Sequence, residues 1–113
     1  MTFTRFSVPG QGDVGVHVDT LWAATPDPDG DGVRLLWDSA RQITVAGDLE
    51  AISAQLGAGF AAFTSPGGGA WRVNRALVLA ALPHPDAAGV TFLQGHTRRQ
   101  AVEGDLAAVL DRL

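Results

Sequence analysis

The segment TPDPDGDG, residues 25–32, has the aspartate spacing of a calcium-binding loop. Three aspartates stand at alternate positions, and a fourth ends the twelve-residue window that the first one begins: Asp27, Asp29, Asp31 and Asp38. Carboxylate oxygens at such intervals suit Ca²⁺, but the loops that use them lie between two helices. Here the window continues into residues 33–37, whose alternating apolar pattern predicts a strand. We therefore favour an acidic turn between two strands, and a calcium site at these four aspartates is the less favoured alternative.

The other polar residues do not combine into a catalytic pattern. His17, His84 and His96 lack the spacing of metal ligands, and the chain contains no cysteine. No serine lies in a G-x-S-x-G context. The glycine-rich segment SPGGGAW lacks the Lys-Ser/Thr that follows a phosphate-binding loop. We expect no enzymatic activity, no catalytic residue and no cofactor.

Arginines gather in the second half of the chain and suggest nucleic-acid binding. Trp71 accompanies four of them: Arg72, Arg75, Arg98 and Arg99. Arginine and aromatic side chains on a sheet can follow a phosphate backbone and stack on bases. The formal net charge of −4 opposes this reading, because phosphate neutralisation dominates such affinity. Nucleic acid is therefore the second choice of partner.

Two tryptophans of the first half are candidates for a protein contact. In a gapless self-alignment, Trp22 falls on Leu79 and Trp37 falls on Gln94. Two residues that served a shared core would differ less between the halves. Because tryptophan is enriched in binding hot spots, Trp22 and Trp37 are the candidate anchors for a protein partner, with an asymmetric core as the alternative.

The chain is duplicated within itself. A shift of 57 residues aligns residues 3–56 with 60–113 without a gap, and 21 of the 54 aligned pairs are identical. The match joins FTRFSVPGQG to FAAFTSPGGG, and VAGDLEAISAQL to VEGDLAAVLDRL. Self-similarity at one fixed offset is the signature of a structural repeat.

Each repeat predicts a β-meander followed by one helix. Alternating apolar residues and Pro-Gly turns predict strands near 3–8, 14–18, 21–24, 33–37 and 45, and near the matching positions of the second repeat. Asp48 and Asp105 are expected to cap the two helices. The predicted fold class is α+β: two β-meander and helix units, 1–57 and 58–113, packed about a pseudo-twofold axis as one compact domain. The three-residue connection at 57–59 is too short for independent domains.

Composition excludes several broad classes. The apolar fraction of 46% and charged fraction of 18% are those of a globular chain. No apolar run approaches the roughly 20 residues of a membrane span, so we expect a cytoplasmic protein with no membrane partner. The charge is uneven: residues 1–57 hold three arginines and eight acidic residues, and residues 58–113 hold five arginines and four acidic residues.

The repeat pattern resembles the small FlbD-type flagellar proteins of bacteria. The matching residues are clearest in the second unit: Val73, Asn74, Val78, Pro85, Asp86, Val90, Phe92, Gly95, Val102 and Val109. In the first unit His17 stands at the asparagine position and Asp38 at the glycine position. This resemblance implies a tandem version of a small, non-enzymatic bacterial accessory factor, without catalytic residues.

The sequence thus favours a bacterial binding protein whose partner is another protein or a second copy of itself. The alternative is a nucleic-acid-binding module that uses the arginines of residues 58–113. A third reading, a hydrolase or metal-dependent protein centred on the aspartate turn, is the least favoured.

Overall fold

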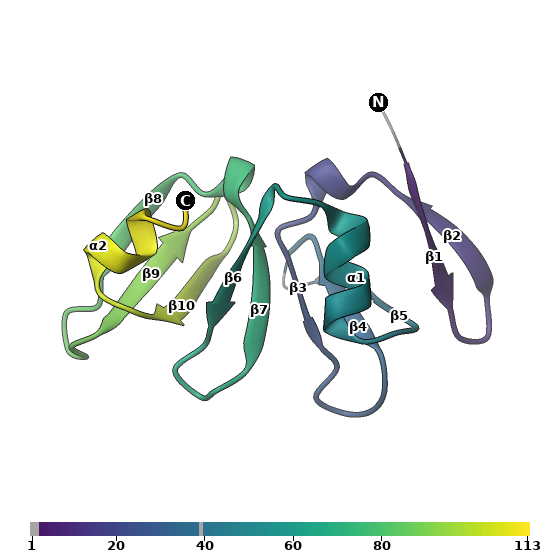
Figure 1. The fold of residues 1–113 in the computed structure, drawn as a ribbon, viewed down its shortest axis with the longest axis horizontal. Helices are drawn as coiled ribbons and strands as arrows, with labels where there is room; N and C mark the ends of the chain where they lie inside the picture. The colour runs from purple at the N-terminus through teal and green to yellow at the C-terminus, as the bar shows by residue number, and fades with distance from the viewer. Residues whose placement is uncertain (1–2, 39) are drawn as a thin grey trace.

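The computed structural model describes residues 3–38 and 40–113, which form ten strands, two α-helices and two 3-10 turns (Figure 1). The first half contains β1 (Thr4–Val8), β2 (Gly12–Val16), η1 (Val18–Thr20), β3 (Ala23–Pro26), β4 (Val33–Leu36), β5 (Gln42–Val45) and α1 (Leu49–Leu56). The second half contains β6 (Phe60–Thr64), β7 (Ala70–Asn74), η2 (Arg75–Leu77), β8 (Ala80–Pro83), β9 (Val90–Gln94), β10 (Arg99–Glu103) and α2 (Leu106–Leu110).

The strands form three antiparallel sheets. The hairpin β1-β2 stands alone, β5-β4-β3-β7-β6 form a five-stranded sheet, and β10-β9-β8 form a three-stranded sheet. The five-stranded sheet joins the two halves through pairing of β3 with β7, in which Ala23 lies opposite Val73 and Ala24 opposite Arg72. The N-terminal hairpin and the three-stranded sheet lie at opposite ends of the molecule (Figure 1).

Two hydrophobic cores lie on the two faces of the five-stranded sheet. The first core joins the β1-β2 hairpin, the meander β3-β5 and α1, and it also takes in Phe60 from the second half. The second core joins β6, β7, the three-stranded sheet and α2, and it also takes in Trp22 and Ala23 from the first half. Each half therefore contributes side chains to the core of the other.

Local signals set the helix starts as the sequence predicts. The Asp48 carboxylate accepts a hydrogen bond from the Ala51 backbone N–H at 2.8 Å, and Asp105 accepts one from Ala108 at 2.9 Å. Each bond satisfies a donor of the first helical turn that has no partner within the helix. The two predicted caps are confirmed.

The predicted α+β class is wrong, because strands hold 42% of the described residues, and helices together with the 3-10 turns hold 17%. The helices contain eight and five residues, and they cover sheet faces without forming layers of their own. Each repeat contains the one helix that its sequence predicts, but that helix is short beside five strands. Within the described residues no helix has the length and apolarity needed to cross a bilayer.

The predicted pseudo-twofold axis is also wrong. A twofold axis would exchange β3 with β8 and β7 with β2. Pairing of β3 with β7 would therefore require pairing of β8 with β2 in the same molecule. Instead β2 and β8 belong to separate sheets, at opposite ends of the longest axis. The two halves follow one another in an open, head-to-tail arrangement.

The register of the strands also revises the gapless self-alignment. Ala23 and Ala24 pair with Leu36 and Leu35, whereas Ala80 and Ala81 pair with Gln94 and Leu93. The offset is therefore 58 residues at β4 and β9, and it returns to 57 at β5 and β10. Trp37 consequently corresponds to Gly95 and not to Gln94.

Candidate nucleic-acid interface

A groove of about 610 Å³ runs along the five-stranded sheet, on the face opposite α1. Its lining comes from four strands of that sheet, from the β3-β4 turn, from the loop before β7 and from the β9-β10 loop: Thr25, Pro26, Asp27, Pro28, Arg34, Leu36, Gln42, Gly69, Ala70, Trp71 and Arg98. Side chains alternate between the faces of a strand, so Arg34 and Leu36 face the groove while Val33 and Leu35 enter the first core. The same sheet thus separates the first core from an open groove.

Arg98 is the cation at the second-half side of this groove. Its guanidinium carbon lies 5.9 Å from the ring centroid of Trp71, an arrangement that permits cation–π attraction. Burial lowers the pKa of Arg98, and the nearby Asp38 carboxylate opposes that shift. Because the arginine pKa starts so high, the side chain keeps its charge near neutral pH. Its Nε atom is buried and has no hydrogen-bond partner among the described residues.

The position of Arg98 depends on a tight hairpin loop packed against Trp22. The Gly95 N–H donates to the Arg98 carbonyl at 2.8 Å, which closes the loop between β9 and β10. Gly95 lies directly against the Trp22 indole, where an added Cβ would stand 2.6 Å from Cζ3. Trp22 itself is buried, with 3% of its surface exposed. The predicted partner anchor Trp22 is therefore a core residue that supports the Arg98 loop.

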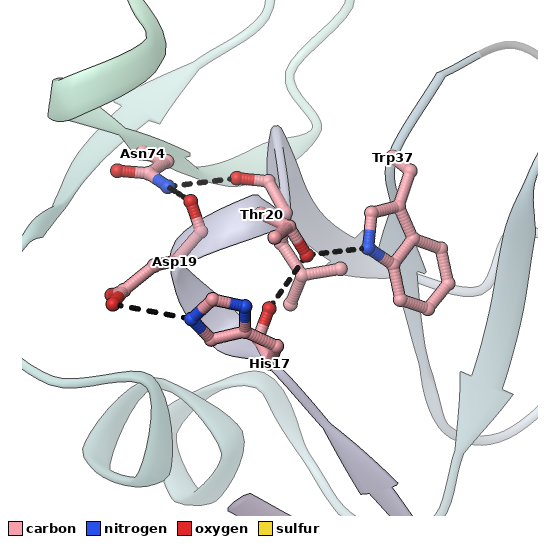
Figure 2. A network of polar contacts seen from close by, with 6 residues as sticks. His17, Asp19, Thr20, Trp37 and Asn74 are labelled. Carbon is pink, nitrogen blue, oxygen red and sulfur yellow. Dashed lines mark hydrogen bonds and ion pairs between the residues drawn. The ribbon is translucent and has the colours of Figure 1, made fainter. Parts of the chain in front are cut away.

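The other predicted anchor, Trp37, takes part in a polar network around η1 (Figure 2). Its indole Nε1 donates to the Thr20 hydroxyl at 2.9 Å, and that hydroxyl donates to the His17 carbonyl at 2.6 Å. The Asn74 amide donates to the carbonyls of Leu21, at 2.9 Å, and of Asp19, at 3.1 Å. These bonds fix the turn that precedes β3 against the end of β7, and they leave Trp37 partly exposed.

The four arginines that the sequence singles out do not form one patch. Arg98 lines the groove, whereas Arg72 follows Trp71 along β7 and points to the opposite face. Arg99 lies 4.8 Å from the Phe92 ring centroid and donates to Gln94 at 3.0 Å, on the outer face of the three-stranded sheet. Arg75 donates to the carbonyls of Ala58 and Arg112.

Ion pairing separates the two halves of the chain. Within residues 3–38 and 40–113, every ion pair that involves an arginine lies in the first half: Arg5 with Asp13, Arg34 with Asp27 and Asp29, and Arg41 with Asp38. The arginines of the second half bind carbonyl groups or stack on rings. Among the described residues, no carboxylate pairs with them directly, although the Asp38 carboxylate acts on Arg98 at longer range.

The aspartate segment forms a turn between β3 and β4. The Asp27 N–H donates to the Gly32 carbonyl at 3.0 Å, and Gly32 has a φ of 101° that glycine adopts readily. Asp27 and Asp29 both contact the Arg34 guanidinium, while Asp38 lies in the next loop and binds Arg41. Asp31 is exposed. No group of three metal-ligating side chains converges within the part of the chain that the structure describes.

The sequence reading missed the first-half wall of the groove. Arg34, Gln42 and Thr25 come from three adjacent strands, so only the pairing of those strands brings them together. Alternation along residues 33–36 does indicate that Arg34 and Leu36 share a face. It does not indicate that Trp71 and Arg98 lie across from them.

Comparisons with known proteins agree with this architecture. No protein-family model matches the sequence, and no curated protein is significantly similar to it. Among solved structures, the fold is similar to a LytTr DNA-binding domain of a putative methyl-accepting/DNA response regulator from Bacillus cereus. The TM-score is 0.65 at 13% sequence identity, over 97% of this chain and 94% of that one.

This similarity corrects the functional expectation. The preferred reading, a protein-binding adaptor, is contradicted by a fold similar to that of a DNA-binding domain. The net charge of the whole chain was a poor basis for placing nucleic acid second among the partners. The acidic residues cluster in the first half, where several of them neutralise arginines of that same half. The FlbD-type resemblance and the expected lack of enzymatic activity stay predictions.

Proposed function

We propose that this domain binds DNA through the side of the groove that Arg98 and Trp71 form. The observation that carries the proposal is a partly buried arginine without an acidic partner within hydrogen-bonding distance, held on an aromatic ring in a fold shared with a DNA-binding domain. A phosphate oxygen is a suitable partner for such a guanidinium, because charge-assisted bonds to arginine are short and strong.

Two loops flank Arg98 and extend the proposed contact. His96 and Thr97 are exposed beside it in the β9-β10 loop. On the other side, the turn before β7 is closed by a hydrogen bond from Gly69 N–H to the Ser65 hydroxyl at 3.1 Å. Hydroxyl groups and exposed backbone N–H groups are common phosphate donors, and they position a protein on DNA without reading its sequence.

The charge distribution limits the strength of this binding. Arg34 lies on the groove, but Asp27 and Asp29 already neutralise it. Few phosphates are therefore contacted, and we expect weak, non-specific affinity at physiological salt, in the range of about 10⁻⁴ to 10⁻⁶ M. The salt dependence should be correspondingly shallow.

The test is fluorescence anisotropy of a labelled DNA duplex, titrated with the protein at several salt concentrations. Arg98→Gln should weaken binding and lower the slope of log K against log salt by about 0.9, the contribution of one phosphate contact. Arg5→Gln is the matched control, because Arg5 is exposed at the far hairpin and pairs with Asp13. No binding at low salt, or equal binding by Arg98→Gln and the unaltered protein, would overturn the proposal.

A further inference from the structure

The junction between the two halves is an interface between the strands of one repeat and a hairpin of the other. β3 of the first half pairs with β7 of the second. The Asn74 backbone N–H donates to the Trp22 carbonyl at 2.8 Å, and the buried Asn74 side chain donates to the carbonyls of Leu21 and Asp19. A three-stranded meander thereby receives a hairpin as its fourth and fifth strands.

Each end of the molecule presents the counterpart of one side of this junction. The element order of the first half recurs in the second, so the β1-β2 hairpin corresponds to β6-β7, and β8-β10 correspond to β3-β5. Among the described residues, β2 of the N-terminal hairpin pairs only with β1, and β8 at the C-terminal end receives no hairpin. Gly15 and Val16 stand at the positions of Arg72 and Val73, and Ala80 and Ala81 at those of Ala23 and Ala24.

The large apolar side chains exposed at the two ends are counterparts of residues that the internal junction buries. Phe3 is 60% exposed, whereas its counterpart Phe60 is 8% exposed within the first core. Leu79 is 58% exposed, whereas its counterpart Trp22 is 3% exposed within the second core. Phe60 and Trp22 are side chains that cross from one half into the core of the other.

Further exposed apolar side chains belong to the last part of the chain, as Leu79 does. Leu113 is 37% exposed and corresponds to Leu56, which is 6% exposed. Leu82 and Leu110 are also exposed, and they replace the polar residues Thr25 and Ser53. Leu82 lies in β8 itself, and α2, which carries Leu110, packs beside that strand.

Edge chemistry and charge both permit another strand to add here. Neither β2 (GDVGV) nor β8 (AALP) carries a lysine, a residue that commonly protects sheet edges. Pro83 ends β8 as Pro26 ends β3, and β3 still pairs with β7 through Ala23 and Ala24. A head-to-tail contact also brings the acidic first half of one molecule against the second half of the next, where arginines outnumber acids. The two ends therefore repeat the element order of the internal junction, and the halves that carry them differ in charge.

We propose that a second copy of this chain binds the C-terminal end by adding its β1-β2 hairpin to the free edge of β8. Val16 of one copy lies opposite Ala80 of the other, and Gly15 lies opposite Ala81. The composite sheet has the order β10-β9-β8-β2-β1, which repeats that of β5-β4-β3-β7-β6. Because the two binding ends lie far apart along the 43 Å axis, the contact is heterologous and continues as an open chain of molecules.

Sedimentation velocity over a wide concentration range tests the proposal. The average mass of the unaltered protein in solution should increase with concentration. Phe3→Asp disables the N-terminal binding end and Leu79→Asp the C-terminal one, so each variant alone should remain monomeric. An equimolar mixture of the two variants retains one intact N-terminal end and one intact C-terminal end, and it should form dimers and nothing larger. Ala54→Asp, on the exposed face of α1, is the charge-matched control and should assemble normally.

Disulfide trapping gives a second readout that does not need a charged substitution. The chain has no cysteine, so Gly15→Cys and Ala81→Cys introduce the only thiols. Directly opposed residues of antiparallel strands lie close enough for a disulfide. Oxidation of the two single variants mixed together should yield a covalent dimer, and the double variant should yield a ladder. A monomer at all concentrations with no heterodimer on mixing, or assembly that survives Phe3→Asp, would overturn the proposal.

Discussion

Gly95 lies directly against the indole of Trp22, so closely that a methyl group on its Cα would stand 2.6 Å from Cζ3. The contact joins the loop that carries Arg98 to a buried ring donated by the other half of the chain. The placement of the candidate DNA-binding arginine thus depends on the absence of one side chain.

Gly95→Ala should therefore destabilise the protein and displace Arg98. Trp22 is a rigid, buried ring, so the clash should reduce the free energy of unfolding by about 1–3 kcal/mol. Urea denaturation measures this change, and Gly67→Ala is the control because nothing lies within 4 Å of the added Cβ. Gly67→Ala should stay within about 0.5 kcal/mol of the unaltered protein. Equal stability of both variants would contradict the packing seen here.

Trp71→Leu should weaken DNA binding without changing its salt slope. The substitution removes the ring beneath the Arg98 guanidinium, and a cation–π contact contributes about 0.5–2 kcal/mol. The guanidinium itself remains, so the number of phosphate contacts should not change. Anisotropy titrations at several salt concentrations separate this effect from that of Arg98→Gln. Trp71→Phe keeps an aromatic face and should give an intermediate affinity.

Asp38→Asn should lower stability at neutral pH and lose this effect in acid. The Arg41 side chain and the backbone N–H groups of Ala40 and Arg41 lower the pKa of Asp38 below 3.8 in the folded state. A carboxylate with a depressed folded pKa stabilises the fold above its unfolded pKa, and that contribution disappears as the pH falls through the folded pKa. The melting temperatures of the variant and the unaltered protein should therefore converge below about pH 4. Asp31→Asn, at an exposed aspartate in the β3-β4 turn, is the control and should show no such convergence.

His17→Asn should strengthen the head-to-tail association. His17 stands at the position of Asn74, whose amide makes two side-chain hydrogen bonds across the internal junction. In the monomer His17 instead stacks on Phe3, with its Nε2 3.6 Å from Asp19. A net gain of about 1 kcal/mol or more from the added bonds should tighten association by about fivefold or more. Sedimentation equilibrium measures the dissociation constant, and a weaker association would exclude the equivalence of the two junctions.

Local features of this fold were predictable from sequence, and the nonlocal pairing was not. The helix caps at Asp48 and Asp105 and the turn at Gly32 follow from residues close in the chain. The pairing of β3 with β7 joins residues about fifty positions apart, and neither strand pattern specifies its partner. Trp22 illustrates the consequence: its mismatch with Leu79 suggested a binding residue, whereas it fills a core that extends across the two halves.

The groove was hidden for the same reason. The sequence picks out Arg98 and Trp71 by type, but their approach depends on the three-stranded sheet folding over the five-stranded one. The one-residue shift at β4 and β9 was also invisible, because a longer turn before β9 and a shorter one after it cancel in the overall length. Equal spacing of two repeats therefore did not guarantee equal register inside them.

The exchange of Phe60 and Trp22 between the two cores also determines when the chain can fold during synthesis. A nascent chain that ends at Gly57 lacks Phe60 and the strand that covers the edge of β3. Its apolar cluster and that open edge stay exposed until β7 has been translated. The two halves therefore complete their folding together, and a chain truncated at their boundary is a target for chaperones and proteases.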